Sequence, residues 1–443
     1  MNYYETDLLP KSVVCCNINE NNVSIIKISS NTFTIRLPEE IGENNLNITV
    51  NFYSFKENDF IEVPINKYKI VSKEIKEFYI IYNFQVFHND LYSKFVKNVM
   101  NDYLKYVNLK SESYDSCFSK EMVDYPYELD YDFYDIYSEE KKKWMENLNL
   151  NGVYENDFEL AIAIDNDVLY KRYLHNDIST FINMYYEDNF INREKFIKKD
   201  ISRIYVGNEF CHNLFPDEVT LIKILNKAKA DNINITLAFT YIKDCYIEKN
   251  KNIIDKVYLW CKDNKFKIEI IINDFGMIKL LEDKKDYFSL NLGVLLNKRR
   301  KDPRYIYKNG FNESMLLENN LNSNLLHIYL KKYNINVYEY ESCNYKIKIP
   351  KGNHSLHIPF YQTNTSDYCP LYAMCKNGER GWQSLVKNCP KYCSNYVFSY
   401  PKHLKMVGRY NSIFAFNENI MKNSNEINYY IASGINRIVL NFI

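Results

Sequence analysis

The chain has 443 residues, more than one average domain, so we expect two or three folding units, each large enough to bury its own core. Its 56 Lys and Arg residues balance 56 Asp and Glu residues, which excludes a global charge that would draw the whole protein onto nucleic acid or a membrane. No apolar run reaches bilayer length and the first residues do not resemble a signal peptide, so we expect a cytoplasmic protein with no membrane span.

Residues 1–109 are expected to form a small β-rich domain with a closing helix. Short runs rich in β-branched and aromatic residues, such as VSIIKI, TFTIRL and EFYIIYNFQVF, are separated by Asn-rich turns. They are followed by FVKNVMNDYLKYV, whose apolar residues recur at helical spacing. This layout resembles a PilZ-type domain in architecture alone, because the sequence lacks the Arg and Gly motifs that hold a cyclic dinucleotide in such domains.

Residues 110–199 are interpreted as an acidic, Tyr-rich and partly helical connector. The segment DYPYELDYDFYDIYSEEKKKW is followed by the short apolar run FELAIAI and by two helical patterns. The interleaved Tyr and Asp residues suit either a partner surface or a solvated loop with anchoring aromatic side chains, and we favour the loop.

Residues 200–443 alternate strand-like and helix-like segments. Eight strand candidates follow one another here, namely RIYVG, ITLAFTYI, KIEIII, FSLNLGVLL, VYEYES, LHIPFY, SIFAFN and RIVLNFI. Such alternation predicts parallel strands joined by crossovers, and therefore an α/β fold with a (β/α)8-like (TIM-type) barrel, complete or distorted. In barrels of this kind, the chemistry lies at the C-terminal ends of the strands.

The densest chemical feature is a late cysteine cluster. Within DYCPLYAMCKNGERGWQSLVKNCPKYCSNY lie Cys369, Cys375, Cys389 and Cys393. The segment contains Pro and Gly and is therefore loop-like, and loops rarely bury several free cysteines, so metal ligation explains the cluster better than packing. Both zinc and an iron–sulfur cluster suit such thiols, although the C-x5-C and C-x3-C gaps lack the two-residue gap common in zinc sites.

An earlier cysteine is expected at the same end of the barrel. Cys211 follows the strand RIYVG and a Gly that permits a tight turn, which places it at the rim where chemistry is expected. A lone cysteine in such a position is more often a small buried hydrophobic residue.

Three strings together resemble a known family. IYVGNEFCHNLFP, then IEIIINDFGMIKLL, then the late C-x13-C-x3-C spacing are similar to the UbiV-type iron–sulfur proteins of anaerobic hydroxylation, in the collagenase-like U-thirty-two peptidase family. The resemblance covers about residues 200–443. It implies a [4Fe-4S] cluster on four cysteines, namely Cys211, Cys375, Cys389 and Cys393, with Cys369 as the alternative to Cys211.

The resemblance also implies a function. Related proteins hydroxylate RNA bases or quinone precursors without dioxygen, so RNA or a small molecule is the implied substrate and a UbiU-like protein the implied partner. The sequence departs from the family where Tyr-Ala-Met precedes Cys375, and the first two hundred residues have no counterpart. Two alternatives stay open: proteolytic activity, as the family name suggests, and a non-catalytic binding or scaffold protein with structural zinc.

Two further groups are candidates for binding substrate or an anion. Asn273 and Asp274 follow the strand KIEIII, where they suit either ligand binding or capping of the next helix. A basic run follows the strand FSLNLGVLL and suits either an anion site or a solvated loop; its candidates are Lys298, Arg299, Arg300 and Arg304. No Ser–His–Asp set, HExxH helix, P-loop or dinucleotide fingerprint identifies a catalytic residue.

Overall fold

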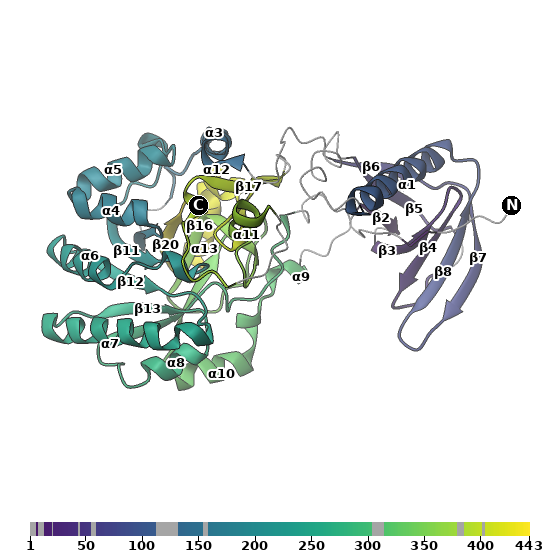
Figure 1. Cartoon of the computed structure of the whole chain (residues 1–443). Coiled ribbons are helices and arrows are strands. Elements are labelled where there is room, and N and C mark those ends of the chain that lie inside the picture. The colour runs from purple at the N-terminus through teal and green to yellow at the C-terminus, as the bar shows by residue number, and fades with distance from the viewer. Residues whose placement is uncertain are drawn as a thin grey trace. The chain divides into compact units, whose positions relative to one another are not determined.

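The computed structural model describes residues 6–7, 13–19, 21–42, 45–54, 59–111, 132–153, 158–303, 314–378, 385–400 and 404–443. The chain divides into two compact units, the first within residues 1–130 and the second within residues 131–303 and 313–443. Each unit encloses a hydrophobic core of its own. Figure 1 shows the strands and helices of each unit. Arg304 lies outside the described residues.

The N-terminal unit is an antiparallel sheet followed by one long helix. Its strands pair in the order β6-β5-β2-β3-β4-β8-β7, and β1 pairs with β3. Tyr92 anchors the helix on the sheet, because its hydroxyl donates to the carbonyl of Thr32 at 2.8 Å. The β-rich character and the helix expected for this region are confirmed. The elements are β1 (Thr6–Asp7), β2 (Val14–Ile18), β3 (Asn21–Ile28), β4 (Thr32–Leu37), β5 (Ile48–Ser54), β6 (Asp59–Pro64), β7 (Tyr68–Ile75), β8 (Ile80–Val86) and α1 (Asp90–Ser111).

The second unit contains a closed barrel of eight parallel strands, as the sequence predicts. Pairing runs in the order β10-β11-β12-β13-β14-β15-β16-β20, and β20 returns to β10 to close the ring. The barrel strands are β10 (Glu159–Ile164), β11 (Ile201–Gly207), β12 (Asn234–Ala238), β13 (Ile268–Ile272), β14 (Phe288–Leu292), β15 (Val337–Glu341), β16 (His354–Thr365) and β20 (Ile435–Asn441).

Two strand assignments made from the sequence were wrong. The run FELAIAI, assigned to the connector, supplies β10, which pairs with the last strand of the chain, a long-range partner that local sequence cannot reveal. The run SIFAFN, counted as a barrel strand, forms β19 (Ser412–Phe416), which pairs antiparallel with the second half of β16 outside the ring. The barrel therefore begins at Glu159.

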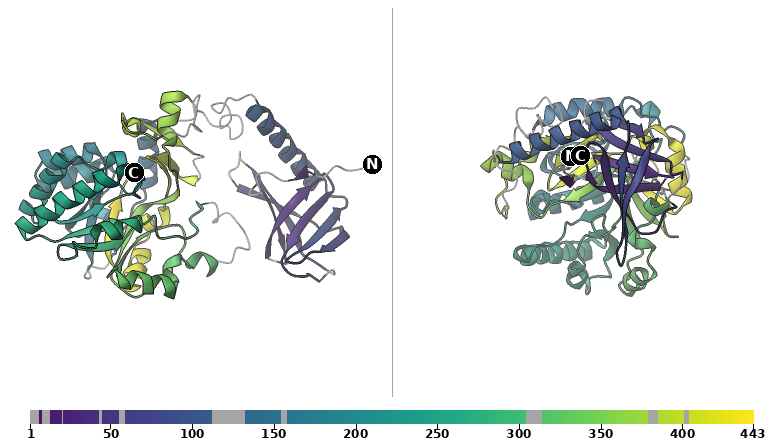
Figure 2. Two further views of the ribbon diagram at one scale, coloured as in Figure 1. Left: turned by 60° about the horizontal axis from the view of Figure 1, so that its bottom comes forward. Right: turned by 90° about the vertical axis from the view of Figure 1, so that its right-hand side faces the viewer.

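Helices surround the barrel strands on the outside (Figures 1 and 2). Side chains cap several of them at the N-terminus; for example, Asp217 accepts a hydrogen bond from the backbone N–H of Thr220 at 2.9 Å before α6. The helices are α3 (Tyr134–Met145), α4 (Asp167–His175), α5 (Ile178–Asp188), α6 (Glu218–Ala230), α7 (Ile247–Asn264), α8 (Gly276–Leu281), α9 (Ser314–Leu317), α10 (Asn324–Lys332), α11 (Pro370–Asn377), α12 (Glu418–Lys422) and α13 (Ser424–Ala432).

A long excursion separates the last two barrel strands. The second half of β16 leaves the ring and joins a small antiparallel sheet with β19, β18 (Met406–Arg409), β17 (Tyr396–Ser399) and β9 (Asp132–Phe133). The excursion also contains α11 and the short helical turn η6 (Tyr392–Ser394), which together with the segments around them carry the late cysteines. Because β16 is parallel to the other barrel strands, this excursion starts at the C-terminal end of the barrel.

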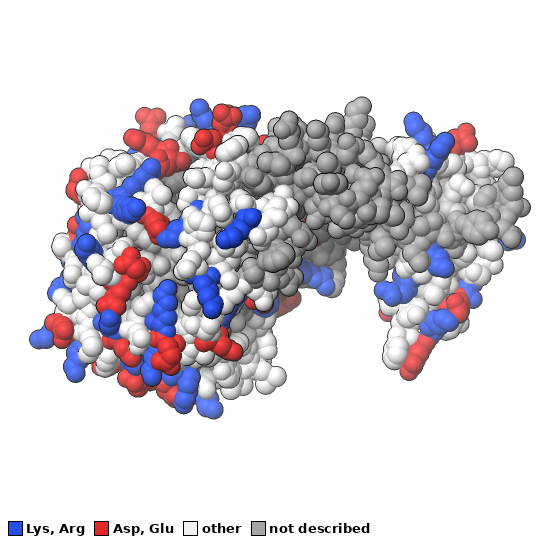
Figure 3. All heavy atoms as spheres, in the orientation of Figure 1, with Lys and Arg blue, Asp and Glu red and all other residues white. Residues whose placement is uncertain are grey.

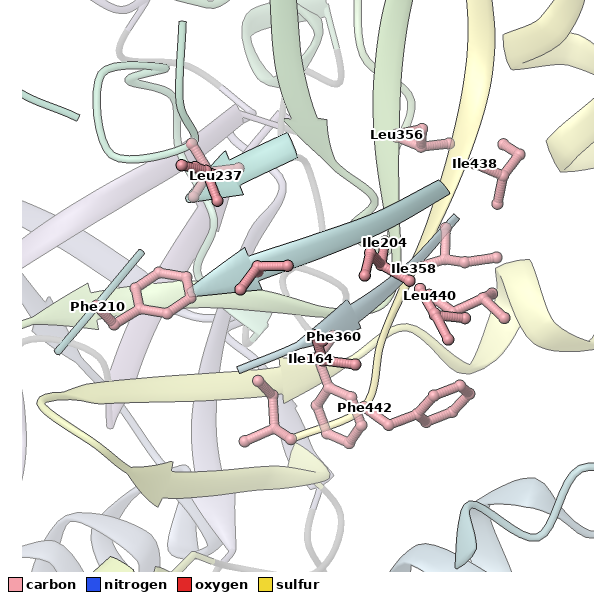
Figure 4. Close-up of a cluster of buried hydrophobic side chains, with 14 of the residues drawn as sticks. Ile164, Ile204, Phe210, Leu237, Leu356, Ile358, Phe360, Ile438, Leu440 and Phe442 are labelled. Carbon is pink, nitrogen blue, oxygen red and sulfur yellow. The ribbon is translucent and has the colours of Figure 1, made fainter. Parts of the chain in front are cut away.

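The two faces of the barrel wall differ in chemistry. On β10, Leu160, Ile162 and Ile164 belong to the large core between strands and helices, whereas Ala161 faces the other way. Figure 4 shows aliphatic side chains from β10, β11, β12, β16 and β20 gathered in that core. The inward positions carry many polar residues, and these place a network of charged side chains inside the barrel.

The exposed surface carries mixed charge. Lys and Arg side chains are interspersed with Asp and Glu on the visible face of the barrel unit (Figure 3). Among the described residues, no helix combines the length and the apolar character needed to cross a bilayer.

Candidate functional site: a thiol pocket beside the barrel mouth

Local backbone geometry places Cys211 at the C-terminal end of the barrel. β11 ends at Gly207, whose φ of 114° lies in the region that favours glycine and where a Cβ would overlap the carbonyl of Ala238. The side chain of Asn208 then accepts hydrogen bonds from the backbone N–H groups of Phe210 and Cys211, both at 2.9 Å. This turn buries Cys211, which is 6% exposed, and points it toward the excursion.

Backbone N–H groups also hold the late thiols. Cys369 is the N-cap of α11, and its sulfur accepts from the backbone N–H of Tyr372 at 3.4 Å. The sulfur of Cys389 accepts from the N–H of Lys391 at 3.3 Å. Cys393 lies in η6 and is 9% exposed. Hydrogen bonds of this kind favour the thiolate form that a metal requires.

Four of the five candidate cysteines line one pocket. Cys211, Cys369, Cys389 and Cys393 surround about 350 Å³ of space not filled by atoms, the open mouth included. The other lining residues are mostly apolar or aromatic, namely Asn213, Leu214, Leu371, Tyr372, Val386, Tyr392 and Tyr410. The structure therefore brings together thiols that are up to 182 positions apart in the chain.

Cys375 differs from these four thiols. It is not among the lining residues of the pocket, although it lies near enough to Cys393 for the two ionisations to influence each other. Cys211 and Cys369, which the sequence treated as alternatives, both line the pocket. Among the described residues, no three His, Cys, Asp or Glu side chains converge closely enough for a single metal ion.

Burial in the pocket favours neutral thiols. Burial raises the pKa of Cys369 to about 11 and, against the opposing charge of Arg409, that of Cys393 to about 12. Burial also raises the pKa of Cys211 far above its usual value, and the neighbouring thiols add to the effect. A metal that binds here must therefore displace protons.

Arg409 is a buried cation beside the thiols that the sequence analysis did not identify. It is 8% exposed, and its Nε donates to the carbonyl of Cys393 at 2.9 Å. Its guanidinium also stacks over Tyr134 at 4.5 Å. A fixed positive charge next to a group of thiolates offsets their negative charge.

The candidate anion residues do not form one site. Lys298 and Arg300 are exposed, whereas Arg299 donates to the carbonyl of Glu341, and Lys301 pairs with the Glu341 carboxylate. Alternate residues of this run thus turn to opposite sides, which explains why the basic run does not act as a single patch.

Asn273 and Asp274 have different environments. Asp274 accepts from the backbone N–H groups of Gly276 at 2.7 Å and Ile242 at 3.3 Å, which is a structural capping role. Asn273 is buried and donates to the carboxylate of Glu209 at 2.8 Å. It therefore belongs to the polar lining of the barrel mouth.

The barrel interior contains a charged network that the sequence analysis missed. Arg437 contacts Glu159 at 2.6 Å and holds Glu269 through two bonds at 2.7 and 2.8 Å. Farther along the barrel, His357 Nε2 lies 2.9 Å from the carboxylate of Glu339. The alternating glutamates of VYEYES, in an otherwise apolar strand, were the pattern that could have identified inward-facing polar positions.

Comparisons with known proteins do not identify a family. No family model matches the chain, and no curated protein matches it. The solved structure of YcgR in complex with c-di-GMP from Escherichia coli has a TM-score of 0.20 and 10% identity, covering 25% of this chain and 49% of that chain. An uncharacterized Legionella protein has a TM-score of 0.17 and 16% identity, covering 23% of this chain and 99% of that chain.

Proposed function

We propose that the thiol pocket holds a [4Fe-4S] cluster on Cys211, Cys369, Cys389 and Cys393. The observation that carries the proposal is that these four sulfurs, from three separate segments, line one pocket at the C-terminal end of a parallel barrel. Chemistry in such barrels is concentrated at that end. The ligand set differs in one member from the set that the family resemblance implies, because Cys369 takes the place of Cys375.

The surroundings of the sulfurs support a multi-iron centre. Backbone N–H groups donate to the sulfurs of Cys369 and Cys389, and hydrogen bonds of this type tune iron–sulfur clusters. In a tetrahedral zinc site each sulfur lies about 2.3 Å from one ion, so zinc would require these thiols to move toward a common point. A cluster of several irons holds its ligands farther apart.

The proposed activity follows the U-thirty-two resemblance. The closed parallel barrel and the convergence of an early cysteine with the late ones support a protein of the type that hydroxylates RNA bases or quinone precursors without dioxygen. With all four irons ligated by thiolates, the cluster would supply electron transfer or structural support. Substrate binding would then fall to the polar residues of the barrel mouth.

Anaerobic purification with iron and sulfide quantification tests the proposal. We expect a brown protein with about four irons per chain, as in a [4Fe-4S] cluster. Cys389→Ser and Cys393→Ser should lose most of the iron, whereas Cys245→Ser, at an exposed cysteine, should retain it. A colourless protein that contains zinc would contradict the proposal and support the scaffold alternative.

One variant pair decides between the two ligand sets. If the pocket-lining thiols are the ligands, Cys369→Ser loses iron and Cys375→Ser retains it. The reverse result would restore the set that the family resemblance implies. Circular dichroism of each variant separates the loss of ligands from the loss of fold.

A further inference from the structure

A second cavity lies inside the mouth of the barrel. It is lined by the last inward-facing residues of several strands. Its volume not filled by atoms is about 430 Å³, the open mouth included. On one side, Ala163, Gly207 and Ala238 are small and leave this space open. The lining also includes four His, Asp or Glu side chains, namely His357, Glu341, Asp165 and, from the loop after β11, Glu209. Asp165 accepts from Asn166 at 2.8 Å. The enclosed part has room for about two water molecules.

The histidine in this cavity is held in one orientation. Its Nε2 lies 2.9 Å from Glu339, and its ring packs edge-on against Tyr205 with the centroids 5.5 Å apart. Glu339 is fully buried and also accepts from Ser355 at 3.1 Å and Asn291 at 3.2 Å, so the carboxylate is itself fixed. Within the described part of the chain, Nδ1 of His357 has no hydrogen-bond partner, which leaves it for a ligand.

The surrounding charges favour a protonated ring. Burial alone would lower the pKa of His357, but the hydrogen bond to Glu339 and the charges of Glu339, Glu209 and Glu341 raise it overall. A protonated ring would carry a hydrogen on Nδ1 and act as a donor into the cavity.

Glu209 supplies the complementary acceptor. It is 7% exposed, and its Oε2 accepts from Asn273 at 2.8 Å and from the N–H of Val294 at 3.2 Å. These bonds fix the carboxylate and leave Oε1 available. Glu341 is already bound by Lys301 and by the N–H of Gln362 at 2.7 Å. The cavity thus presents Nδ1 of His357 and Oε1 of Glu209 between fixed walls. Burial raises the pKa of Glu209 to about 7, and it is the deprotonated carboxylate that accepts.

We propose that this cavity is a ligand site for a neutral amide-type group, whose carbonyl oxygen accepts from His357 Nδ1 and whose N–H donates to Glu209. Glu339 is the positioning residue that holds the ring of His357. The site is separate from the thiol pocket and does not depend on the presence of a metal.

Acetamide and acetate form a matched pair of probes, because they have the same shape. Acetamide is neutral and carries an N–H donor, whereas acetate is an anion and has no donor. In full-length protein labelled with ¹⁵N-histidine, acetamide should shift the Nδ1 resonance of His357 saturably, and acetate should leave it unchanged. His354 is an internal control on the same strand, since it stacks on Tyr338 with its Nδ1 accepting from the Tyr338 N–H. Histidine-to-asparagine variants assign the two resonances.

Glu209→Gln tests the recognition itself. The new side chain can still accept from Asn273 and Val294, and it then presents an NH2 group to the cavity in place of an oxygen. We expect it to weaken acetamide binding about tenfold and to let acetate bind. Ala238→Val, which fills the cavity without removing a polar group, should abolish binding of both probes.

Other outcomes would overturn the proposal. These are the absence of a His357 shift with acetamide, equal shifts with both probes, or equal shifts of His354. Cys389→Ser should bind acetamide with unchanged affinity even where it has lost iron, so failure of the cluster proposal and failure of this one are distinguishable.

Discussion

The thiol pocket and the polar residues of the barrel mouth lie at the same end of the fold. The two regions differ in how their ionisable side chains are held. The thiols lie in loops and at short helical turns, and burial raises the pKa of Cys369 and Cys393, so these thiols keep their protons. The interior groups are contributed by strands and are already paired, as in the contact of His357 with Glu339. The side chains of the first region are therefore neutral in the fold, whereas the charged groups of the second are already paired and preorganised by the fold itself.

Removal of one member of the preorganised network should have the largest effect. Glu339→Ala leaves His357, Ser355 and Asn291 without their shared buried acceptor, so we expect the free energy of unfolding to fall by about 3–5 kcal/mol. Urea denaturation measures this loss. Glu282→Ala is the surface control, because its partner Lys279 is exposed and such pairs contribute about 0–1 kcal/mol. Equal effects of the two substitutions would show that the interior network is not preorganised.

The difference between local patterns and long-range pairing explains which features were predictable from the sequence. The alternation of strands and helices after Asp200 was local, so the parallel barrel was predicted correctly. Closure of the ring depends on β10, a six-residue strand whose partner β20 begins 271 positions later than β10 ends, and no local pattern encodes that pairing. The strand β19 is largely apolar, like the barrel strands. What distinguishes it is its pairing, which is antiparallel to the second half of β16.

In the candidate sites too, residues that are close in the sequence were predicted, and pairs that form only through the fold were not. Cys369, Cys389 and Cys393 are close in sequence and were found as a cluster, and the position of Cys211 after a strand indicated that it would join them. The pairing of His357 with Glu339 joins two different strands across an inner face, so only the fold reveals it. The sequence left Cys369 and Cys211 as alternatives and included Cys375, whereas in the structure both alternatives line the pocket and Cys375, in helix α11, does not.

Gly207 connects the two regions and should show the next largest effect. It ends β11, lines the barrel cavity and precedes the turn that positions Cys211. Gly207→Ala places a Cβ against the carbonyl of Ala238 at a φ of 114°, so we expect a loss of about 1–3 kcal/mol. We also expect a lower iron content, measured in the same preparations.

Gly42→Ala is the control, since no atom of the described residues, apart from its own chain neighbours, lies within 4 Å of the added Cβ. It should leave both stability and iron content nearly unchanged. If Gly207→Ala behaves in the same way, the turn after β11 does not constrain the position of Cys211.

The smallest predicted effect concerns the protons of the thiols. In metal-free protein, burial raises the pKa of Cys369 from 9.0 to about 11, so the folded chain holds this proton more tightly than the unfolded chain does. Stability from this thiol is therefore present below pH 9 and is lost as the pH rises toward 11. From pH 8 to pH 10 the loss should amount to about 1 kcal/mol, since one pKa unit corresponds to 1.36 kcal/mol.

The difference in unfolding free energy between wild type and Cys369→Ser isolates this loss, because Tyr and Lys residues titrate alike in both proteins. We expect the difference to shrink by about 1 kcal/mol between pH 8 and pH 10 in the metal-free state. Protein that has been loaded with metal should show no such trend, because a ligating thiol has already lost its proton. A trend that persists unchanged after metal loading would mean that Cys369 is not a ligand, and the proposed distinction between the two regions would then rest on the other three thiols alone.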